Sequence, residues 1–362
     1  MNQPIITVII PVKNEERHLG KVLESLKKQT LAKSEFEIIV VDGGSSDHTI
    51  SVAAKYTQSF NHFQIFYNPL GFSSAARNIG ILHSRGKYIL VIDGHTHLEQ
   101  RDYLDQVIFE FAKSGADCLG RPQPLVCMNP TWIQKGIRFA RESWIGHNPH
   151  SAIYQNTAGF MRAANIAVAY RRSVFHEIGL FDEKMDACED VELNTRIDRA
   201  GLTCFFSPEL SLNYHPRSSL SGLFKQMKRY GVGRARLALK HPSTISLPSI
   251  APSLFLITLI LMTIQSLYEW KLSFSLLITI SIYFSILIIE ALRIGLNRKS
   301  FLVALLPCFW GAIHLGFAYG YLIGLLGSFD KPRLSYFERG MRKQYYYQNP
   351  LLQNRIPIKV RS

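Results

Sequence analysis

The strongest constraint on this chain is a long apolar block near its C-terminal end. Ile250–Tyr268 contains no charged residue over 19 positions, and Leu272–Ile289 contains none over 18. A helix needs about 20 apolar residues to cross a hydrocarbon layer roughly 30 Å thick, so each stretch is long enough to span it. Only Glu269, Trp270 and Lys271 separate the two stretches, and this spacing predicts a membrane hairpin.

A third uncharged stretch, Ser300–Phe329, contains Pro307, His314 and several glycines. Basic residues flank the whole block: residues 217–240 carry seven Lys/Arg and no acid, and residues 331–362 carry eight Lys/Arg against one Glu. Cytoplasmic flanks of membrane segments are rich in Lys and Arg, which favours an even number of crossings. We therefore expect two crossings, with the third stretch re-entrant, bent or lying in the interface. Three crossings are the alternative.

The net charge of +14 comes from these two flanks, each of which contributes +7. A basic chain can bind nucleic acid, but charge placed beside an apolar block is typical of contact with anionic lipid, so no nucleic-acid partner is expected. The five cysteines lack metal-ligand spacing and are expected as reduced core residues. No basic region precedes the first apolar run, so we expect no signal peptide and a cytoplasmic N-terminal part, anchored at the plasma (inner) membrane.

The first 120 residues alternate between short β-branched runs and segments of helical spacing, which predicts an α/β fold: a mostly parallel sheet with helices on both faces. The expected strands are 6–12, 36–42, 63–68, 87–93 and 117–120, and the expected helices begin near 19, 50, 73 and 103, with Ser73 or Ser74 as a helix cap. Residues 121–156 are expected to be irregular, followed by a helix from Glu189 and a strand near 202–207.

Polar residues follow three of the expected strands, at the sheet edge where ligands of parallel sheets bind. Asn14 and Glu15 follow the first strand, Asp42 ends the second and Asp93 ends the fourth. Asp93 and His95 form a D-x-H triplet that could ligate a divalent cation on a diphosphate, or Asp93 could cap the next helix. Asp42 precedes a Gly-Gly turn, and it either accepts hydrogen bonds from a nucleotide or only orders that turn.

A helix with further candidates follows the third strand. Its apolar face is predicted from Ala75, Ile79 and Leu82, which leaves Arg77 and Asn78 to approach a nucleotide or to lie on a solvated face.

Two more helices carry candidate groups. Asp190, which follows Glu189 at the start of a helix, is either a general base or one of two acids that suit the helix dipole. Gln226, Arg229 and Tyr230 lie on one basic helix, which could bind a diphosphate or sit on anionic lipid.

Taken together, these segments resemble the family-2, GT-A-fold glycosyltransferases, and within them the ExoA-like group of succinoglycan and polysaccharide biosynthesis. The resemblance covers about Ile5–Lys240 and comprises, in order, VIIPVKNEE, EIIVVDGGSSDHT, AARNIG, VIDGH, RRSVFHEIGLFDE, EDVELNTRIDRAG and YHPRSSLSGLFKQMKRYG. It implies a GT-A domain at 1–240 that ends in a basic interface helix at 217–240. A membrane region at 248–329 and a basic cytoplasmic tail at 330–362 complete the expected organisation.

The resemblance also implies roles residue by residue. On the donor side the matched positions are Pro11, Glu15 and Asp42 for the uracil and ribose, Arg77 near the nucleotide, and Asp93 for the metal. His95 stands where the family has the second acid of its D-x-D motif. Imidazole is a softer ligand than carboxylate, so the implied cofactor is Mn²⁺ or Mg²⁺ with a tilt toward Mn²⁺. His215 is a weaker candidate for the same metal.

On the acceptor side, Asp190 matches the catalytic base.

Three further residues match a donor-binding motif of the family, Q-x-x-R-W: they are Gln226, Arg229 and Tyr230, with Tyr230 in place of Trp. The implied activity is inverting transfer of a sugar from a nucleotide-sugar, expected to be a UDP-sugar, to a lipid-linked or membrane-associated glycan such as a polyprenyl-linked one. A flippase or polymerase is an expected partner. The alternative is an inactive nucleotide-binding membrane scaffold, which the presence of both Asp93 and Asp190 disfavours.

Overall fold

The computed structural model describes residues 3–96, 98–127, 129–147, 152–185, 187–298 and 300–327. By their contacts these residues divide into two compact units. The first unit contains residues up to 124 together with 152–213, and the second contains 125–147 together with 214–327. The tail expected at 330–362 lies outside the described residues.

The first unit is built on a mixed eight-stranded sheet, as the α/β prediction requires. Its strands are β1 (Ile6–Val12), β2 (Phe36–Asp42), β3 (Phe63–Tyr67), β4 (Tyr88–Val91), β5 (Cys118–Gly120), β6 (Gly159–Met161), β7 (Ala167–Arg171) and β8 (Cys204–Phe206). They lie in the order β3-β2-β1-β4-β7-β5-β8-β6. The four strands from β3 to β4 are parallel, and β7 runs antiparallel to its neighbours β4 and β5.

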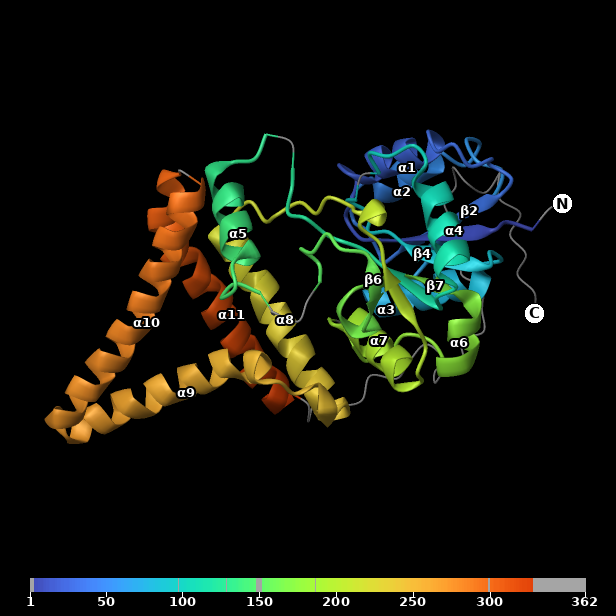
Figure 1. Cartoon of the computed structure of the whole chain (residues 1–362). Helices are drawn as coiled ribbons and strands as arrows, with labels where there is room; N and C mark the ends of the chain where they lie inside the picture. The colour runs from blue at the N-terminus through green and yellow to red at the C-terminus, as the bar shows by residue number, and fades with distance from the viewer. Residues whose placement is uncertain are drawn as a thin grey trace. The chain divides into compact units, whose positions relative to one another are not determined.

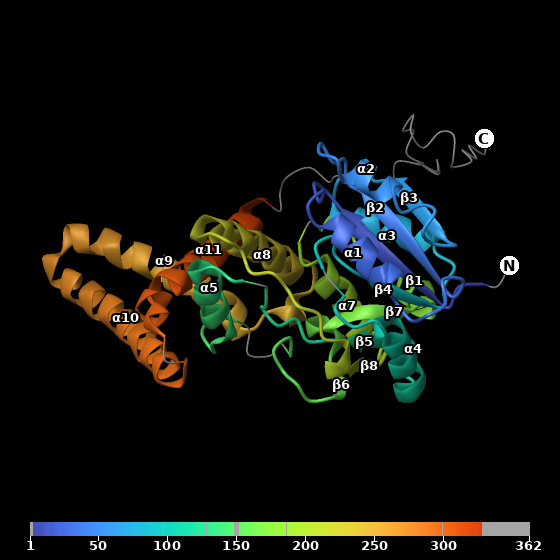
Figure 2. The ribbon, with the colours of Figure 1, turned by 90° about the horizontal axis from the view of Figure 1, so that it is seen from above.

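Helices cover both faces of this sheet. Helices α1 (Leu19–Lys27), α2 (Thr49–Ala54) and α4 (Tyr103–Ser114) pack on one face, and α3 (Ser73–His83), α6 (Arg172–Ile178) and α7 (Glu189–Arg199) pack on the other. Figure 1 shows β4 and β7 between these two layers, and Figure 2 shows the same ribbon from above. Alternate residues of β1 serve the two cores: Val8 and Ile10 face the first layer, whereas Ile9 faces the second.

Three local expectations about the helices are wrong. Neither Ser73 nor Ser74 caps α3, because Phe72 occupies the cap position with an extended backbone and both serines are already helical. Leu82 is 49% exposed, and Ala76 takes its place on the buried face, because α3 packs through its small residues. The region expected to be irregular contains α5 (Trp132–Glu142).

Helix α5 belongs to the second unit and begins with a complete capping box, formed by Thr131 and Gln134. The other helices of this unit are α8 (Leu220–Lys240), α9 (Leu247–Tyr268), α10 (Trp270–Arg298) and α11 (Leu306–Leu326), with the short 3-10 turn η4 (Phe301–Leu305) before α11. A core of its own holds the unit together, and it contains Ile137 and Ala140 of α5, Leu223 of α8 and Trp310 of α11.

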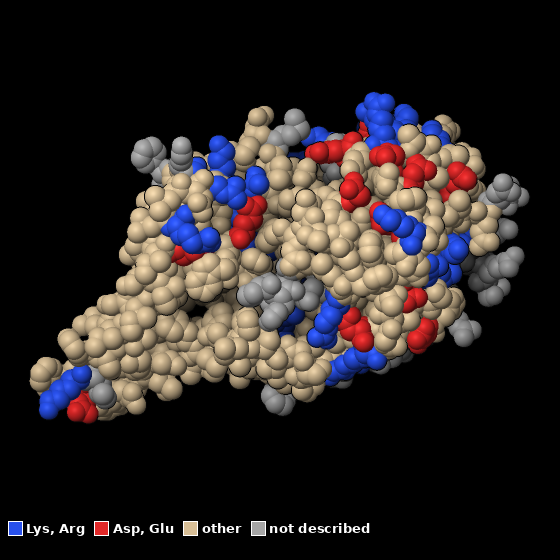
Figure 3. Space-filling model, in the orientation of Figure 1, with Lys and Arg blue, Asp and Glu red and all other residues tan. Residues whose placement is uncertain are grey.

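Three helices of the second unit are long and apolar enough to cross a membrane: Leu247–Tyr268, Ser273–Arg298 and Leu302–Leu326. The first two form the expected hairpin, in which α9 and α10 meet at one end (Figure 1). In Figure 3 the surface of this hairpin shows no charged residue on the visible face except at its tip and at its base. In the third stretch the 3-10 turn η4 leads into the helix α11, and the place of this stretch relative to the membrane stays a prediction.

All five cysteines are free thiols, but the expectation that all of them are core residues is wrong for Cys308. Cys118 and Cys204 are buried as core residues, whereas Cys308 is exposed. The two buried cysteines are register partners on β5 and β8, and a hydrogen bond with Cys204, together with burial, raises the pKa of the Cys118 thiol far above its ordinary value.

Candidate functional site

The loops that follow β1 and β2 are bonded to each other at the carboxyl edge of the sheet. Asn14 adopts a left-handed backbone (φ 57°), its N–H donates to Ser45 Oγ (2.8 Å), and its side-chain oxygen accepts from the Ser46 N–H (2.8 Å). The N–H of Glu15 donates to Thr49 Oγ1 at 2.7 Å. These contacts hold the backbone of Glu15 in place and so fix the direction of its side chain.

Asp42 is fully buried, and its carboxylate orders the Gly-Gly turn. It accepts hydrogen bonds from the N–H of Gly44 (3.1 Å) and from the N–H of Ser45 (3.1 Å to one carboxylate oxygen). The turn-ordering role considered from the sequence is therefore confirmed, while nucleotide binding by Asp42 stays a prediction. Pro11 lies in β1 beyond the last residue that pairs with β4, so its missing N–H leaves no gap in that ladder.

Asp93 and His95 lie in the turn after β4, directly against the end of β1. A Cβ atom added to Gly94 would lie 2.8 Å from Val12 Cγ1 and 3.2 Å from Glu15 Cγ, so glycine permits this close approach. Asp93 does not cap the next helix, because Asp102 precedes α4. That alternative from the sequence is wrong.

His95 is held by Glu15: the His95 Nδ1 to Glu15 Oε1 distance is 3.1 Å. A carboxylate bonded to one imidazole nitrogen fixes the orientation of the ring and its tautomer, as is common for metal-ligating histidines, and metal binding by His95 stays a prediction. The side chains of His95 and Glu15 are 32% and 20% exposed, so the pair is accessible from solvent.

This donor set fits a divalent cation that is shared with a substrate. No group of three or more His, Cys, Asp or Glu with metal-site geometry occurs among the described residues. Mg²⁺ sites that serve phosphate substrates commonly use one or two protein carboxylates, with phosphate oxygens and water completing the shell. Asp93 and His95 would supply one hard and one softer ligand to such a shared cation, and this role stays a prediction.

Arg77 lies among the acids of this site. Its Nη1 is 3.3 Å from Glu189 Oε1, with the two side chains 13% and 7% exposed, and its guanidinium stacks over the Phe181 ring at 5.2 Å. Burial lowers the pKa of Arg77, but the carboxylates of Glu189, Asp190 and Asp93 more than offset this and hold the pKa above its ordinary value. The structure therefore pairs Arg77 with Glu189, and the charges of Asp190 and Asp93 act on its guanidinium.

Asp190 and Glu189 are adjacent in sequence but differ in environment. Asp190 is exposed at the start of α7, where its carboxylate accepts the N–H of Val191 at 2.9 Å. Glu189 is buried against Arg77. Its role as the partner of Arg77 was missed from the sequence, although the conjunction of an arginine in AARNIG with two acids in EDVELN was a usable signal.

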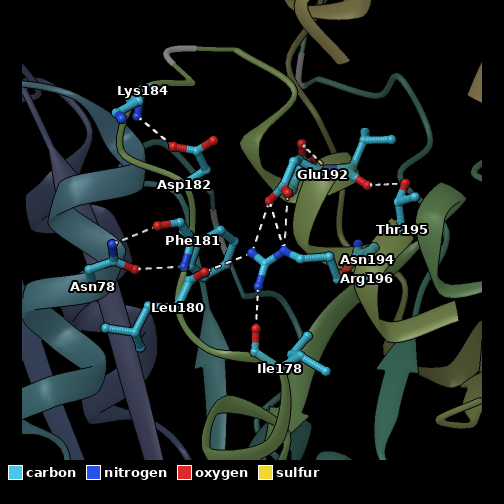
Figure 4. A network of polar contacts seen from close by, with 12 residues as sticks. Asn78, Ile178, Leu180, Phe181, Asp182, Lys184, Glu192, Asn194, Thr195 and Arg196 are labelled. Carbon is cyan, nitrogen blue, oxygen red and sulfur yellow. Dashed lines mark hydrogen bonds and ion pairs between the residues drawn. The ribbon is translucent and has the colours of Figure 1, made fainter. Parts of the chain in front are cut away.

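Buried polar contacts hold α7 against the segment that precedes it in the chain, and hold that segment against α3 (Figure 4). Arg196 pairs with Glu192 at 2.9 Å, and its guanidinium also donates to the carbonyl oxygens of Ile178 and Leu180, the latter at 2.7 Å. Asn78 of α3 is almost fully buried, and its amide bonds to both the N–H and the C=O of Phe181, each at 2.9 Å. The solvated face considered for Arg77 and Asn78 is thus wrong, because the segment before α7 covers it.

The remaining candidate residues lie in the second unit. Gln226 is buried in α8, and its Nε2 donates to Tyr214 Oη (3.1 Å) and to Tyr230 Oη (3.3 Å). Arg229 and His215 are exposed. The Gln226–Tyr230 bond joins two positions of the Q-x-x-R-Y motif, and the donor-binding and metal-binding roles of this group stay predictions.

Known proteins share the sequence and the fold. Residues 7–179 match the family described as Glycosyl transferase family 2. The succinoglycan biosynthesis protein ExoA of Rhizobium meliloti (strain 1021) is 29% identical over 247 residues, which are 68% of this chain and 73% of that protein.

A second relative matches over most of its length. It is the dolichyl N-acetyl-alpha-D-glucosaminyl phosphate 3-beta-D-2,3-diacetamido-2,3-dideoxy-beta-D-glucuronosyltransferase of Methanococcus voltae, which is 24% identical over 330 residues, 89% of this chain and 97% of that protein. The structure of the mannosyltransferase PcManGT from Pyrobaculum calidifontis, in complex with GDP-Man and Mn²⁺, superimposes with a TM-score of 0.52 at 16% identity and covers 91% of this chain and 89% of that one.

The family match, these relatives and the GT-A-like sheet with helices on both faces confirm the resemblance stated from the motifs. The chain therefore carries, over residues 7–179, a domain of glycosyl transferase family 2.

Proposed function

We propose that the protein is an inverting, metal-dependent transferase that moves a sugar from a nucleotide-sugar to a membrane-associated glycan acceptor. The observation that carries the proposal is the Arg77–Glu189 ion pair beside Asp190, the exposed acid at the start of α7. The Arg77 side chain is only 13% exposed, and the negative charges of Glu189, Asp190 and Asp93 raise its pKa. In this arrangement Asp93 lies on the donor side, Asp190 lies on the acceptor side, and Arg77 carries the compensating positive charge. Such a site suits a displacement in which the nucleophile and the leaving group are on opposite sides of the anomeric carbon.

Each group has a distinct task in this proposal. The exposed carboxylate of Asp190 takes the proton of the acceptor hydroxyl as its oxygen attacks the anomeric carbon, an effect worth roughly 10²- to 10⁴-fold in rate. Asp93 and the imidazole of His95 would hold the divalent cation, and Glu15 orients that imidazole. When bound, the cation offsets charge on the leaving diphosphate. Gln226, Arg229 and Tyr230 contribute further contacts to the donor, with His215 as an additional ligand of the cation.

The donor and the acceptor follow from the resemblance and from the relatives. The match of Pro11, Glu15 and Asp42 to uracil- and ribose-binding positions supports a UDP-sugar, and the GDP-Man bound by PcManGT makes GDP the alternative base. The dolichyl phosphate substrate in the name of the Methanococcus voltae relative supports a polyprenyl-linked acceptor. The apolar helices support membrane anchoring, and we place the catalytic domain on the cytoplasmic side, with a flippase or polymerase acting after it.

The test is a donor panel. Membranes containing the full chain are incubated with UDP- and GDP-sugars and polyprenyl-linked acceptors, with Mn²⁺, with Mg²⁺ or with a chelator. The proposal predicts release of nucleoside diphosphate and formation of a glycolipid with one donor, both lost with the chelator. Tight nucleotide binding without release under any condition would instead support the inactive scaffold.

A further inference from the structure

The third candidate span, α11, packs so closely against the basic helix α8 that the glycines of α11 lie against the backbone of α8. A Cβ atom added to Gly320 would lie 2.0 Å from the carbonyl oxygen of Lys228. Gly316 and Gly324, about one turn to either side, would each place a Cβ atom 2.8 Å from another α8 carbonyl oxygen. The two helices therefore run side by side over about two turns, and they share one depth in any membrane.

Helix α8 is too charged to share the depth of a membrane-crossing helix. Beside the Gly316–Gly324 segment it carries a series of cations: Lys225, Lys228, Arg229, Arg234 and Arg236. Each Lys or Arg in the hydrocarbon centre is strongly unfavourable, and no acidic residue lies within α8 to pair with them. A transmembrane α11 would therefore bring a column of cations into the bilayer.

A second charged helix covers another side of α11. The Trp310 Nε1–H donates to the Ala140 carbonyl oxygen (3.1 Å) near the end of α5, and His314 Nε2 lies 2.9 Å from the carbonyl oxygen of Ile145. Helix α5 carries its own charged residues, Lys135, Arg138, Arg141 and Glu142. Two of the helices that contact α11, α8 and α5, are thus charged helices that belong at a polar surface, whereas the others, α9 and α10, are apolar.

The two arms of the hairpin begin at opposite ends of α11. Ile250, near the start of α9, packs with Tyr321 near the end of α11. Ile294, near the end of α10, packs with Val303 and Leu306 at the start of α11. Figure 1 shows α11 running between the end of α10 and the start of α9. If both arms enter the membrane from one surface, as in a hairpin, a helix between their two entry points lies along that surface.

The end of α10 shows where that surface lies. Glu290 is buried, accepts the Trp144 Nε1–H at 2.8 Å, and pairs with Arg293. Arg298 pairs with Glu142 of α5 at 3.2 Å. These groups place the polar boundary after Ile289, at the level of α5.

We propose that α11 lies in the plane of the membrane interface together with α8, and that α9 and α10 alone among the described helices cross the bilayer. The occupant of the exposed face of α11 is lipid: Cys308, Leu315, Tyr319 and Leu326 are its exposed residues, and the α8 cations face anionic headgroups. This inference rests on the membrane anchoring proposed above, and not on the transfer activity. It places the Q-x-x-R-Y helix at the lipid surface, where a lipid-linked acceptor is presented.

Spin-label depth in lipid vesicles tests this arrangement in the full chain. Single labels are placed at the native Cys308 and at Leu315→Cys, Tyr319→Cys and Leu326→Cys, with the other accessible cysteines replaced. Labels at Leu254→Cys, Leu261→Cys and Leu267→Cys on α9 are the matched control. Accessibility to oxygen and to a water-soluble nickel complex reports the depth of each label.

The four α11 labels are expected at one shallow depth, whereas the α9 labels pass through a maximum of oxygen accessibility at the bilayer centre. A rise and fall of depth along α11 equal to that along α9 would overturn the proposal. A reporter fused after residue 362 gives an independent answer, because an interfacial α11 leaves it on the same side as α8, and a crossing α11 puts it on the other. Loss of depth signal from α9 as well would instead refute the membrane anchoring itself.

Discussion

Arg77 is the residue on which the acidic groups of the site converge. Its guanidinium forms an ion pair with buried Glu189. The negative charges of Asp190 and Asp93 also stabilise its positive charge, which raises its pKa. Removing the cation leaves Glu189 buried without a counter-charge, a change that typically costs about 3–5 kcal/mol.

Arg77→Met is therefore expected to lower the free energy of unfolding by about that amount, about 3–5 kcal/mol, measured by chemical denaturation in detergent. Lys28→Ala is the matched control, since Lys28 and Glu24 form an exposed pair at 4.0 Å, whose loss is expected to cost less than about 1 kcal/mol. Equal effects of the two substitutions would show that the Arg77–Glu189 pair is not structurally important.

The contact of Glu15 with His95 makes a second prediction at this scale. If Glu15 orients His95 toward a cation, Glu15→Ala weakens Mn²⁺ binding in the presence of nucleotide by about 10- to 100-fold, measured by electron paramagnetic resonance of free Mn²⁺. In the His95→Asp background the same change has little effect, and metal preference moves toward Mg²⁺. Glu24→Ala is the control. An equal loss in both backgrounds would contradict the orienting role.

At the scale of elements, the sequence predicts the strands better than the contacts of the helices. β1 and β2 have the expected bounds, because a continuous β-branched run ended by polar residues has few other solutions. Helix α5 was not expected: its capping box is local, but its buried face depends on partners more than 150 residues away, such as Trp310. The same is true of Asn78, whose partner Phe181 lies 103 residues along the chain.

The glycines of α11 give the sharpest prediction about element packing. Gly320→Ala places a methyl group against the Lys228 carbonyl oxygen and is expected to cost about 1–3 kcal/mol, even though alanine favours a helix. Gly311→Ala lies on the same helix with no atom within 4 Å of the new methyl, so it is expected to be neutral or stabilising. Thermal unfolding in detergent compares them, and equal behaviour would contradict the close α8–α11 packing.

At the scale of the whole molecule, the contacts group α5 and α8 with the apolar helices. The catalytic domain expected at 1–240 stays a prediction. The motifs could not reveal the grouping of α5 and α8 with the apolar helices, because a motif gives the identity and spacing of residues and not the surfaces that they bury. Ile137 and Leu223 look like ordinary core positions of a soluble domain, yet they pack with Phe309 and Trp310.

A chain truncated after residue 246 is therefore expected to aggregate in detergent-free buffer, because α5 and α8 lose the core that they form with α10 and α11. A chain truncated after residue 327, which retains that whole core, is expected to elute as a defined species in detergent. Size-exclusion chromatography distinguishes them. A monodisperse, cooperatively unfolding 1–246 protein would show that the second unit's core is dispensable.

The central claim, that Asp190 is the base of a sugar-transfer reaction, is tested most directly by measuring donor binding and transfer together in Asp190→Asn. The account predicts that the variant binds nucleotide-sugar with nearly the wild-type dissociation constant while glycolipid formation falls by at least about 10²-fold. Glu24→Gln, an exposed acid on α1, keeps both. Loss of donor binding in parallel with transfer, or transfer at the wild-type rate, would contradict the assignment.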